Sequence, residues 1–153
     1  MTLRFLGDID PEGVERLADC VRQQTAALRP FRLELGGTRP FPSKRRPVAI
    51  VLDVGPLARL EELAESVERG VTTAGFDPEP RPFRAHLTLG RVRGKRFPVV
   101  TGNVTAIGES CAVDEAVLFK SELHRSGAHY TPIERAPLGD KRSPLFTEPD
   151  QSI

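Results

Sequence analysis

Apolar residues in this chain recur with two different periods, one typical of helices and one typical of strands. The helical period predicts one helix over residues 11–29, N-capped by Asp10, and a second over residues 56–74, followed by Gly75 as its C-cap. Alternation of apolar and polar residues, or a short apolar run, predicts six strands. They are expected at residues 1–6, 31–35, 47–54, 86–89, 111–122 and 130–136.

The order of these elements predicts an α+β sandwich. The strand at 47–54 is apolar on both faces except at Asp53, so we expect it in the middle of a sheet. Ser126-Gly127 predicts the turn of a hairpin formed by the last two strands. Thr2-Leu3 and Thr88-Leu89 echo each other, each near a helix of similar length, which suggests a domain of two lobes.

Glycine, proline and polar residues mark the connections between the elements. Gly36-Gly37 is expected to end the strand before it, and residues 38–46 to form a loop. Residues 77–82 contain three prolines and predict a rigid loop. We expect one domain over residues 1–138 and a disordered tail over residues 139–153.

Composition excludes several classes of protein. A chain of 153 residues with 39% hydrophobic and 28% charged residues is expected to form one globular domain. The net charge of +1 excludes a general polyanion binder, so any nucleic-acid contact needs a local basic patch. Cys20 and Cys111 are too few and too far apart for a disulfide framework. With no apolar run of about 18 residues and no secretory pattern, we expect a cytoplasmic protein with no membrane contact.

The segment Arg84–Arg91 carries the candidate chemistry. Alternation places His86 and Thr88 on one face of a strand and Leu87 on the other. A proton-transfer group beside a hydroxyl, with an arginine at each end of the segment, suits a phosphate ester. An ordinary strand histidine is the alternative interpretation of the same pattern.

Two stretches of the chain echo each other and resemble a known family. Residues 2–9, Thr-Leu-Arg-Phe-Leu-Gly-Asp-Ile, continue the pattern His-Leu-Thr-Leu-x-Phe-Leu-Gly, and residues 83–91 match Phe-x-Pro-His-x-Thr-Leu-x-Arg, with Ala85 where proline is common. These resemble the two His-x-Thr-x motifs of the LigT-like 2′-5′ RNA ligase family, the RNA 2′,3′-cyclic phosphodiesterases of the two-histidine phosphoesterase superfamily. Residues 121–123 and 127–131 also resemble that family's closing hairpin.

The resemblance implies a two-lobed antiparallel-sheet sandwich with helices on the outer faces. It also implies that the family's first strand and helix are missing here, and that its first histidine would stand one residue before Met1. Either the start codon lies too late, or the chain is a truncated relative. An uncovered sheet edge would then favour poor stability or self-association of a chain that is otherwise expected to be monomeric.

The resemblance further implies metal-independent opening of a terminal 2′,3′-cyclic phosphate to a 2′-phosphate, without a cofactor. His86 would transfer a proton, while Thr88 and Thr2 would bind phosphate oxygens and Arg91 would clamp the phosphate. Strict alternation puts Arg91 on the face opposite His86, so we expect a bulge at Gly90. The histidines lack metal-ligand spacing, and His124 and His129 are weak candidates for the absent catalytic histidine.

The expected partners are RNA ends or small cyclic nucleotides, and three alternatives stay open. The basic residues Lys44-Arg45-Arg46, with Arg91, Arg93, Lys95 and Arg96, could follow an RNA backbone or could be solvated loops. The chain could be a catalytically inactive RNA- or nucleotide-binding remnant. It could also act on a different small cyclic phosphate.

Overall fold

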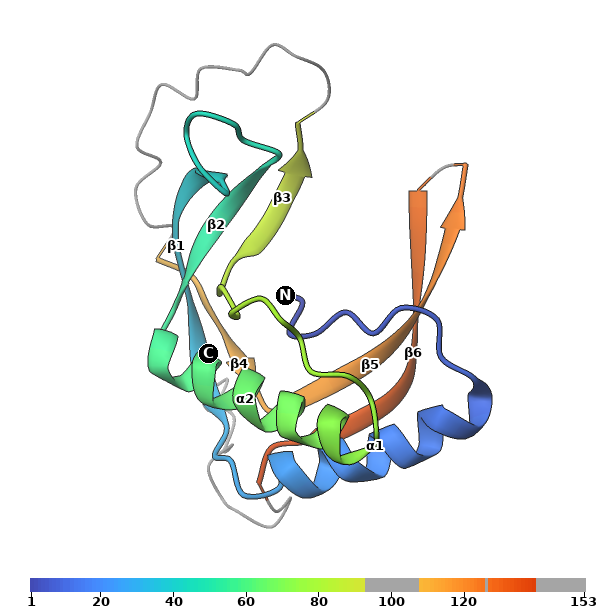
Figure 1. The fold of residues 1–153 in the computed structure, drawn as a ribbon. Helices are drawn as coiled ribbons and strands as arrows, with labels where there is room; N and C mark the ends of the chain where they lie inside the picture. The colour runs from blue at the N-terminus through green and yellow to red at the C-terminus, as the bar shows by residue number, and fades with distance from the viewer. Residues whose placement is uncertain (93–107, 126, 140–153) are drawn as a thin grey trace, which may run out of the picture.

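The computed structural model describes residues 1–92, 108–125 and 127–139, which form two helices and six strands (Figure 1). The helices are α1 (Pro11–Thr25) and α2 (Leu57–Thr73). The strands are β1 (Phe31–Phe41), β2 (Ala49–Gly55), β3 (Leu87–Arg91), β4 (Ser110–Val113), β5 (Glu115–His124) and β6 (Gly127–Pro137).

Both helices are bounded by local signals that the sequence contains. The side chain of Asp10 accepts a hydrogen bond from the Gly13 N–H at 2.7 Å, which confirms the predicted N-cap of α1. Helix α1 ends at Thr25, four residues before the predicted end, and Pro30 follows before β1 begins. After α2, Gly75 adopts a φ of 91°, a conformation that glycine takes without strain.

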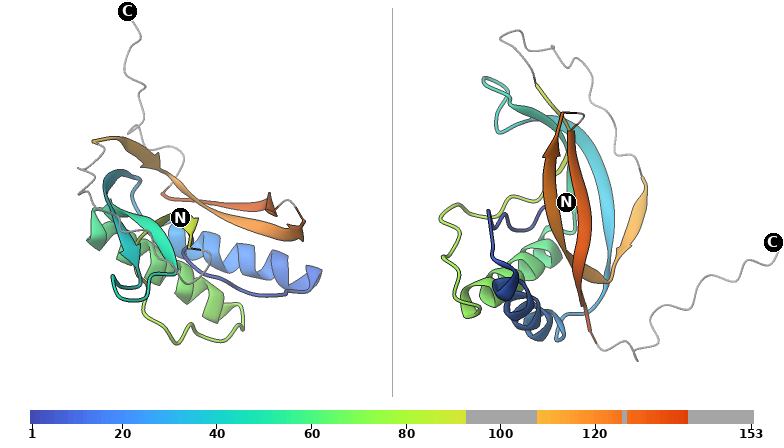
Figure 2. Two further views of the ribbon diagram at one scale, coloured as in Figure 1. Left: turned by 90° about the horizontal axis from the view of Figure 1, so that it is seen from above. Right: turned by 90° about the vertical axis from the view of Figure 1, so that its right-hand side faces the viewer.

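The strands form two antiparallel sheets that rise from the helix pair as two arms (Figures 1 and 2). The first sheet has the order β3-β2-β1-β4, which confirms the predicted central position of β2. The second is the β5–β6 hairpin, also as predicted. The predicted single strand at 111–122 is instead two, since Asp114 separates β4 in one sheet from β5 in the other. The α+β, two-lobed architecture is thus confirmed.

Strand β1 contradicts the prediction that Gly36-Gly37 ends it. The strand continues to Phe41, and its register against β2 shifts between Leu35 and Thr38. A Cβ at Gly36 would lie 3.1 Å from both the Cβ and the carbonyl oxygen of Asp53. The glycine therefore permits a close approach of two backbones, and residues 38–41 belong to the sheet rather than to a loop.

The core is divided between the two lobes, and the helices pack closely at Gly70, where a Cβ would lie 2.8 Å from the Val21 Cα. One cluster joins both helices to the β5–β6 sheet, and it contains Leu17, Leu28, Leu63, Val67, Val71, Ala74 and Leu138. The other lies between α2 and the first sheet, and it contains Leu33, Val54 and Leu60. Burial of these apolar surfaces fixes each sheet against a helix.

The N-terminal segment, residues 1–10, forms no strand, so the prediction of a strand at 1–6 is wrong. A strand needs a neighbour to pair with, and this segment instead packs Leu3 and Leu6 against the first core cluster. Phe5 is 73% exposed. The predicted tail beyond Gly139 and the basic residues at 93, 95 and 96 lie outside the described residues.

Two further findings apply to the described residues. Cys20 and Cys111 are both free thiols. Neither helix is long and apolar enough to span a membrane.

Candidate functional site

His86 lies directly before β3, and its ring has a defined orientation. Its Nδ1–H donates a hydrogen bond to the carbonyl oxygen of Arg84 at 2.6 Å, because a carbonyl can only accept. This bond leaves Nε2 as the nitrogen that can exchange a proton with a substrate. The side chain is half-buried, so the ring is held by the protein but is still accessible.

Phe41 packs against His86, which the sequence did not indicate. The two rings are stacked, with centroids 4.4 Å apart and an angle of 18° between their planes. The guanidinium carbons of Arg84 and Arg39 lie 4.7 and 5.6 Å from the Phe41 centroid, in cation–π geometry. The aromatic ring therefore positions the imidazole and gathers two cations beside it.

A bulge in β3 brings Thr88 and Arg91 to one face. Thr88 pairs with Val51 and Gly90 with Ile50, which leaves Leu89 without a partner on β2. The predicted bulge is confirmed, one residue before the expected position. Arg91 then lies opposite Ala49.

Directly opposite residues share a face of a sheet, as do residues two apart along a strand. Since Val51 and Ala49 are two apart on β2, Thr88 and Arg91 share a face, and both are exposed. On β1 the same rows contain Arg39 opposite Val51 and Phe41 opposite Ala49. We call this face of the sheet the His86 face. Its accessible side chains are Arg39, Phe41, Thr88 and Arg91, with His86 stacked on Phe41, whereas Ala49 and Val51 on the same face are buried.

One acidic side chain balances part of this positive charge. Asp53 forms an ion pair with Arg39. Arg84 and Arg91 have no ion-pair partner within the part of the chain that the structure describes. The His86 face therefore presents a proton-transfer group, a hydroxyl and an excess of cations, the combination that an anionic phosphate requires.

Thr2, the other candidate hydroxyl, is exposed on the N-terminal segment. Figure 1 shows the chain's N-terminus between the two sheets, near the start of β3. No described hydrogen bond joins Thr2 to His86, Thr88 or Arg91, so its role stays a prediction.

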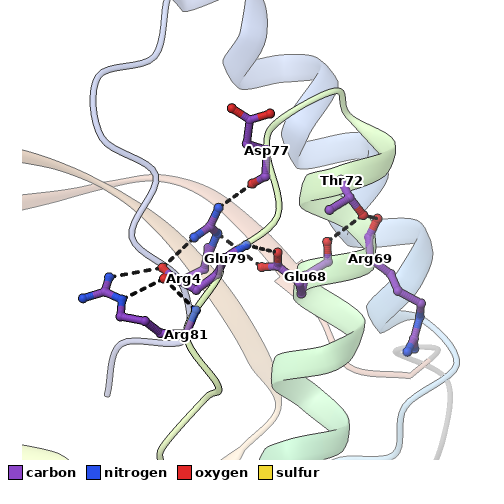
Figure 3. A network of polar contacts seen from close by, with 7 residues as sticks. All are labelled: Arg4, Glu68, Arg69, Thr72, Asp77, Glu79 and Arg81. Atoms are coloured by element: carbon purple, nitrogen blue, oxygen red, sulfur yellow. Dashed lines mark hydrogen bonds and ion pairs between the residues drawn. The ribbon is translucent and has the colours of Figure 1, made fainter.

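Arg4 fastens this segment to the rest of the molecule (Figure 3). Its guanidinium forms ion pairs with Glu68 of α2 at 3.2 Å and with Glu79 at 2.7 Å, and donates to the Asp77 carbonyl at 2.6 Å. Glu79 also accepts hydrogen bonds from Arg81, which lower the pKa of Glu79 to about 2. The segment that carries Thr2 is thus tied to the loop that leads to His86.

The other histidines form no metal centre with their described neighbours. His124 and His129 contact each other near the tip of the β5–β6 hairpin, with ring centroids 4.7 Å apart. Among the described residues, no group of three or more His, Cys, Asp or Glu side chains is arranged to hold a metal ion. The His86 face accordingly contains one histidine, and His124 and His129 lie on a different sheet.

Known proteins resemble this chain in sequence over most of its length. The family model described as 2′-5′ RNA ligase superfamily matches residues 1–125. A protein from Aeropyrum pernix named RNA 2′,3′-cyclic phosphodiesterase is 34% identical over 138 residues, covering 85% of this chain and 76% of the relative. A protein of the same name from Methanothermobacter thermautotrophicus is 32% identical over 140 residues, covering 87% and 74%.

Solved structures show the same fold. A protein from Thermus thermophilus superposes with a TM-score of 0.74 at 28% identity, covering 91% of this chain and 78% of its own. E. coli LigT in complex with 3′-AMP superposes with a TM-score of 0.74 at 27% identity, covering 91% and 76%. The two curated relatives are, by name, phosphoric diester hydrolases. The family match, these relatives and the shared fold together show that the chain belongs to the 2′-5′ RNA ligase superfamily.

Proposed function

We propose that the chain binds a terminal ribose 2′,3′-cyclic phosphate of RNA on the His86 face and opens it to a 2′-phosphate without a metal. The observation that carries this proposal is the bulge at Leu89, which puts Thr88 and Arg91 on one face beside the oriented ring of His86. The names of the curated relatives and the 3′-AMP complex of E. coli LigT support it.

The reaction requires two proton transfers. Water loses a proton as its oxygen bonds to phosphorus, and the ribose 3′-oxygen gains one as its bond to phosphorus breaks. His86 performs one of these transfers through Nε2, as base or as acid. Thr88, Arg91 and Thr2 bind the phosphate oxygens that take no part in bond breaking, and they stabilise the charge that develops there.

The second transfer distinguishes this function from its alternative. In the family pattern a histidine stands before the first Leu-Thr pair, at the position preceding Met1. The His86 face itself offers one imidazole, whereas the reaction needs two proton transfers. This favours a second candidate function, in which the chain binds RNA ends without hydrolysing them. Loss of one general acid or base typically costs about 10²–10⁴-fold in rate.

A hydrolysis assay separates the two functions. The substrate is a short RNA that ends in a 2′,3′-cyclic phosphate, with a chelator present. The proteins are the chain itself, a version in which Met-His-Leu replaces Met1, and the His86→Ala change in each. We expect the version with the added histidine to be faster by at least about a hundredfold, and His86→Ala to abolish that gain.

Two outcomes would contradict the catalytic proposal. If the version with the added histidine binds the RNA but leaves the ring closed, the binding function is correct. If His86→Ala leaves the rate unchanged in an active protein, His86 takes no part in the reaction.

A further inference from the structure

The loop that joins β1 to β2 carries a cluster of exposed cations next to the His86 face. The Val48 N–H donates to the Phe41 carbonyl at 2.8 Å, which closes the loop over residues 42–47. At its tip, the Arg46 N–H donates to the Ser43 hydroxyl at 3.4 Å. Lys44, Arg45 and Arg46 are all exposed. We call this segment the basic loop.

The charge of the basic loop is not balanced by the residues around it. Between residues 38 and 53 the only acidic side chain is Asp53, and it pairs with Arg39. Within the described ranges, no ion pair involves Lys44, Arg45 or Arg46, whereas six cations outside residues 38–53 have acidic partners. Such pairs involve Arg4, Arg22, Arg59, Arg81, Lys120 and Arg135.

The basic loop begins where the site ends. The ring of Phe41 stacks on His86, and Lys44 follows Phe41 by three residues. Three residues of extended chain span at most about 11 Å. The first cation of the basic loop therefore lies within the length of one or two nucleotides from the position proposed for the reacting phosphate.

The geometry of the substrate points to the occupant of this loop. A cyclic phosphate occupies the 3′ end of an RNA, so the remaining nucleotides leave the site in the 5′ direction alone. The first anions on that path are the phosphodiesters next to the end. Exposed lysine and arginine side chains bind such phosphates without reading sequence.

We propose that the basic loop is a binding site for the phosphodiester backbone of the RNA strand 5′ to the cyclic end. The substrate class is accordingly an oligonucleotide rather than a free cyclic mononucleotide. This inference rests on the proposed function for the position of the RNA end. It adds a second site, which the catalytic proposal does not need.

Binding and turnover of two substrates test the inference. Fluorescence anisotropy measures the affinity for a labelled RNA decamer that ends in a 2′-phosphate, at several salt concentrations, with unlabelled 2′-AMP as competitor. Turnover of a cyclic-ended decamer and of 2′,3′-cyclic AMP is measured in the version with the added histidine. The variant is Lys44→Ser/Arg45→Ser/Arg46→Ser, and the control is Arg29→Ser/Arg32→Ser, which removes cations near the opposite end of β1.

The expected result is specific to long ligands. Three lost phosphate contacts make the negative slope of log affinity against log salt shallower by about 2 and weaken decamer binding roughly a hundredfold at about 0.1 M salt. The affinity for 2′-AMP and the turnover of 2′,3′-cyclic AMP stay within a factor of about two of the parent protein, since neither ligand reaches the basic loop. The control variant keeps the salt slope of the parent protein.

Each other outcome decides against one proposal. An unchanged salt slope in the basic-loop variant, or an equal loss with the control, overturns the backbone site. An equal loss for the decamer and for 2′-AMP shows that the loop supports the fold of the His86 face instead. If neither cyclic substrate is opened but the decamer still depends on the loop, the catalytic proposal fails and the backbone site stands.

Discussion

The contact between the two helices predicts a stability change that opposes helix propensity. Alanine in a helix interior is favoured over glycine by about 1 kcal/mol, so Gly70→Ala would stabilise an isolated α2. In the folded protein the new Cβ would lie 2.8 Å from the Val21 Cα and 3.0 Å from its backbone nitrogen. Because those are backbone atoms, the helices must separate, which costs about 3 kcal/mol. The net expectation is a loss of about 2 kcal/mol.

Chemical denaturation followed by circular dichroism measures this difference. Glu61→Ala, at an exposed position of the same helix, is the control and should change stability by less than about 0.5 kcal/mol. Val21→Ala should not rescue Gly70→Ala, since it removes only side-chain atoms and leaves the obstructing backbone in place. A Gly70→Ala protein as stable as the parent would refute the reasoning, because it would mean that the helices can move apart freely.

Three further predictions follow from particular contacts. Since the pKa of Glu79 is lowered to about 2, Glu79 stabilises the fold above pH 4.5 and loses this effect as the pH falls toward 2. The melting temperatures of the parent and Glu79→Gln proteins should therefore differ at about pH 6 and converge near pH 2. Phe41→Leu removes the stack on His86, so in the version with the added histidine kcat on a cyclic-ended RNA should fall up to about tenfold with little change in KM, and a change confined to KM would argue against positioning. We expect the exposed Phe5 to promote self-association, so Phe5→Ser should reduce it in sedimentation velocity more than Leu57→Ser does; a monomeric parent protein, or equal effects of the two changes, would contradict this expectation.

The sequence was most informative where a local rule determines the structure. The N-cap at Asp10, the positive φ of Gly75 and the bulge near Gly90 each depend on residues within a few positions, and each is present, although the C-cap of α2 is Ala74, one residue before the predicted Gly75. The family motif around His86 likewise lies in one continuous segment.

The errors concern contacts between distant segments. Gly36-Gly37 is compatible with either a turn or a close pairing of strands, and only the neighbouring Asp53 decides between them. Residues 1–6 have a strand-like pattern but no strand paired with them. The stack of Phe41 on His86 joins residues that are far apart along the sequence, and no local pattern records it. The orientation of the candidate site therefore required the structure.

The unpaired Leu89 has a consequence for how this site can change. Thr88 pairs with Val51 and Arg91 pairs with Ala49. Whether Thr88 and Arg91 share a face depends on the number of residues between these two pairs on each strand, and not on the identity of those residues. Deleting Leu89 would give regular pairing and leave both side chains on one face. One residue inserted between Ile50 and Val51 would instead give Leu89 a partner and turn Arg91 away from Thr88. We therefore expect the arrangement of Thr88 and Arg91 to survive substitution or loss of residue 89, and to be lost when a single residue is added to the neighbouring strand.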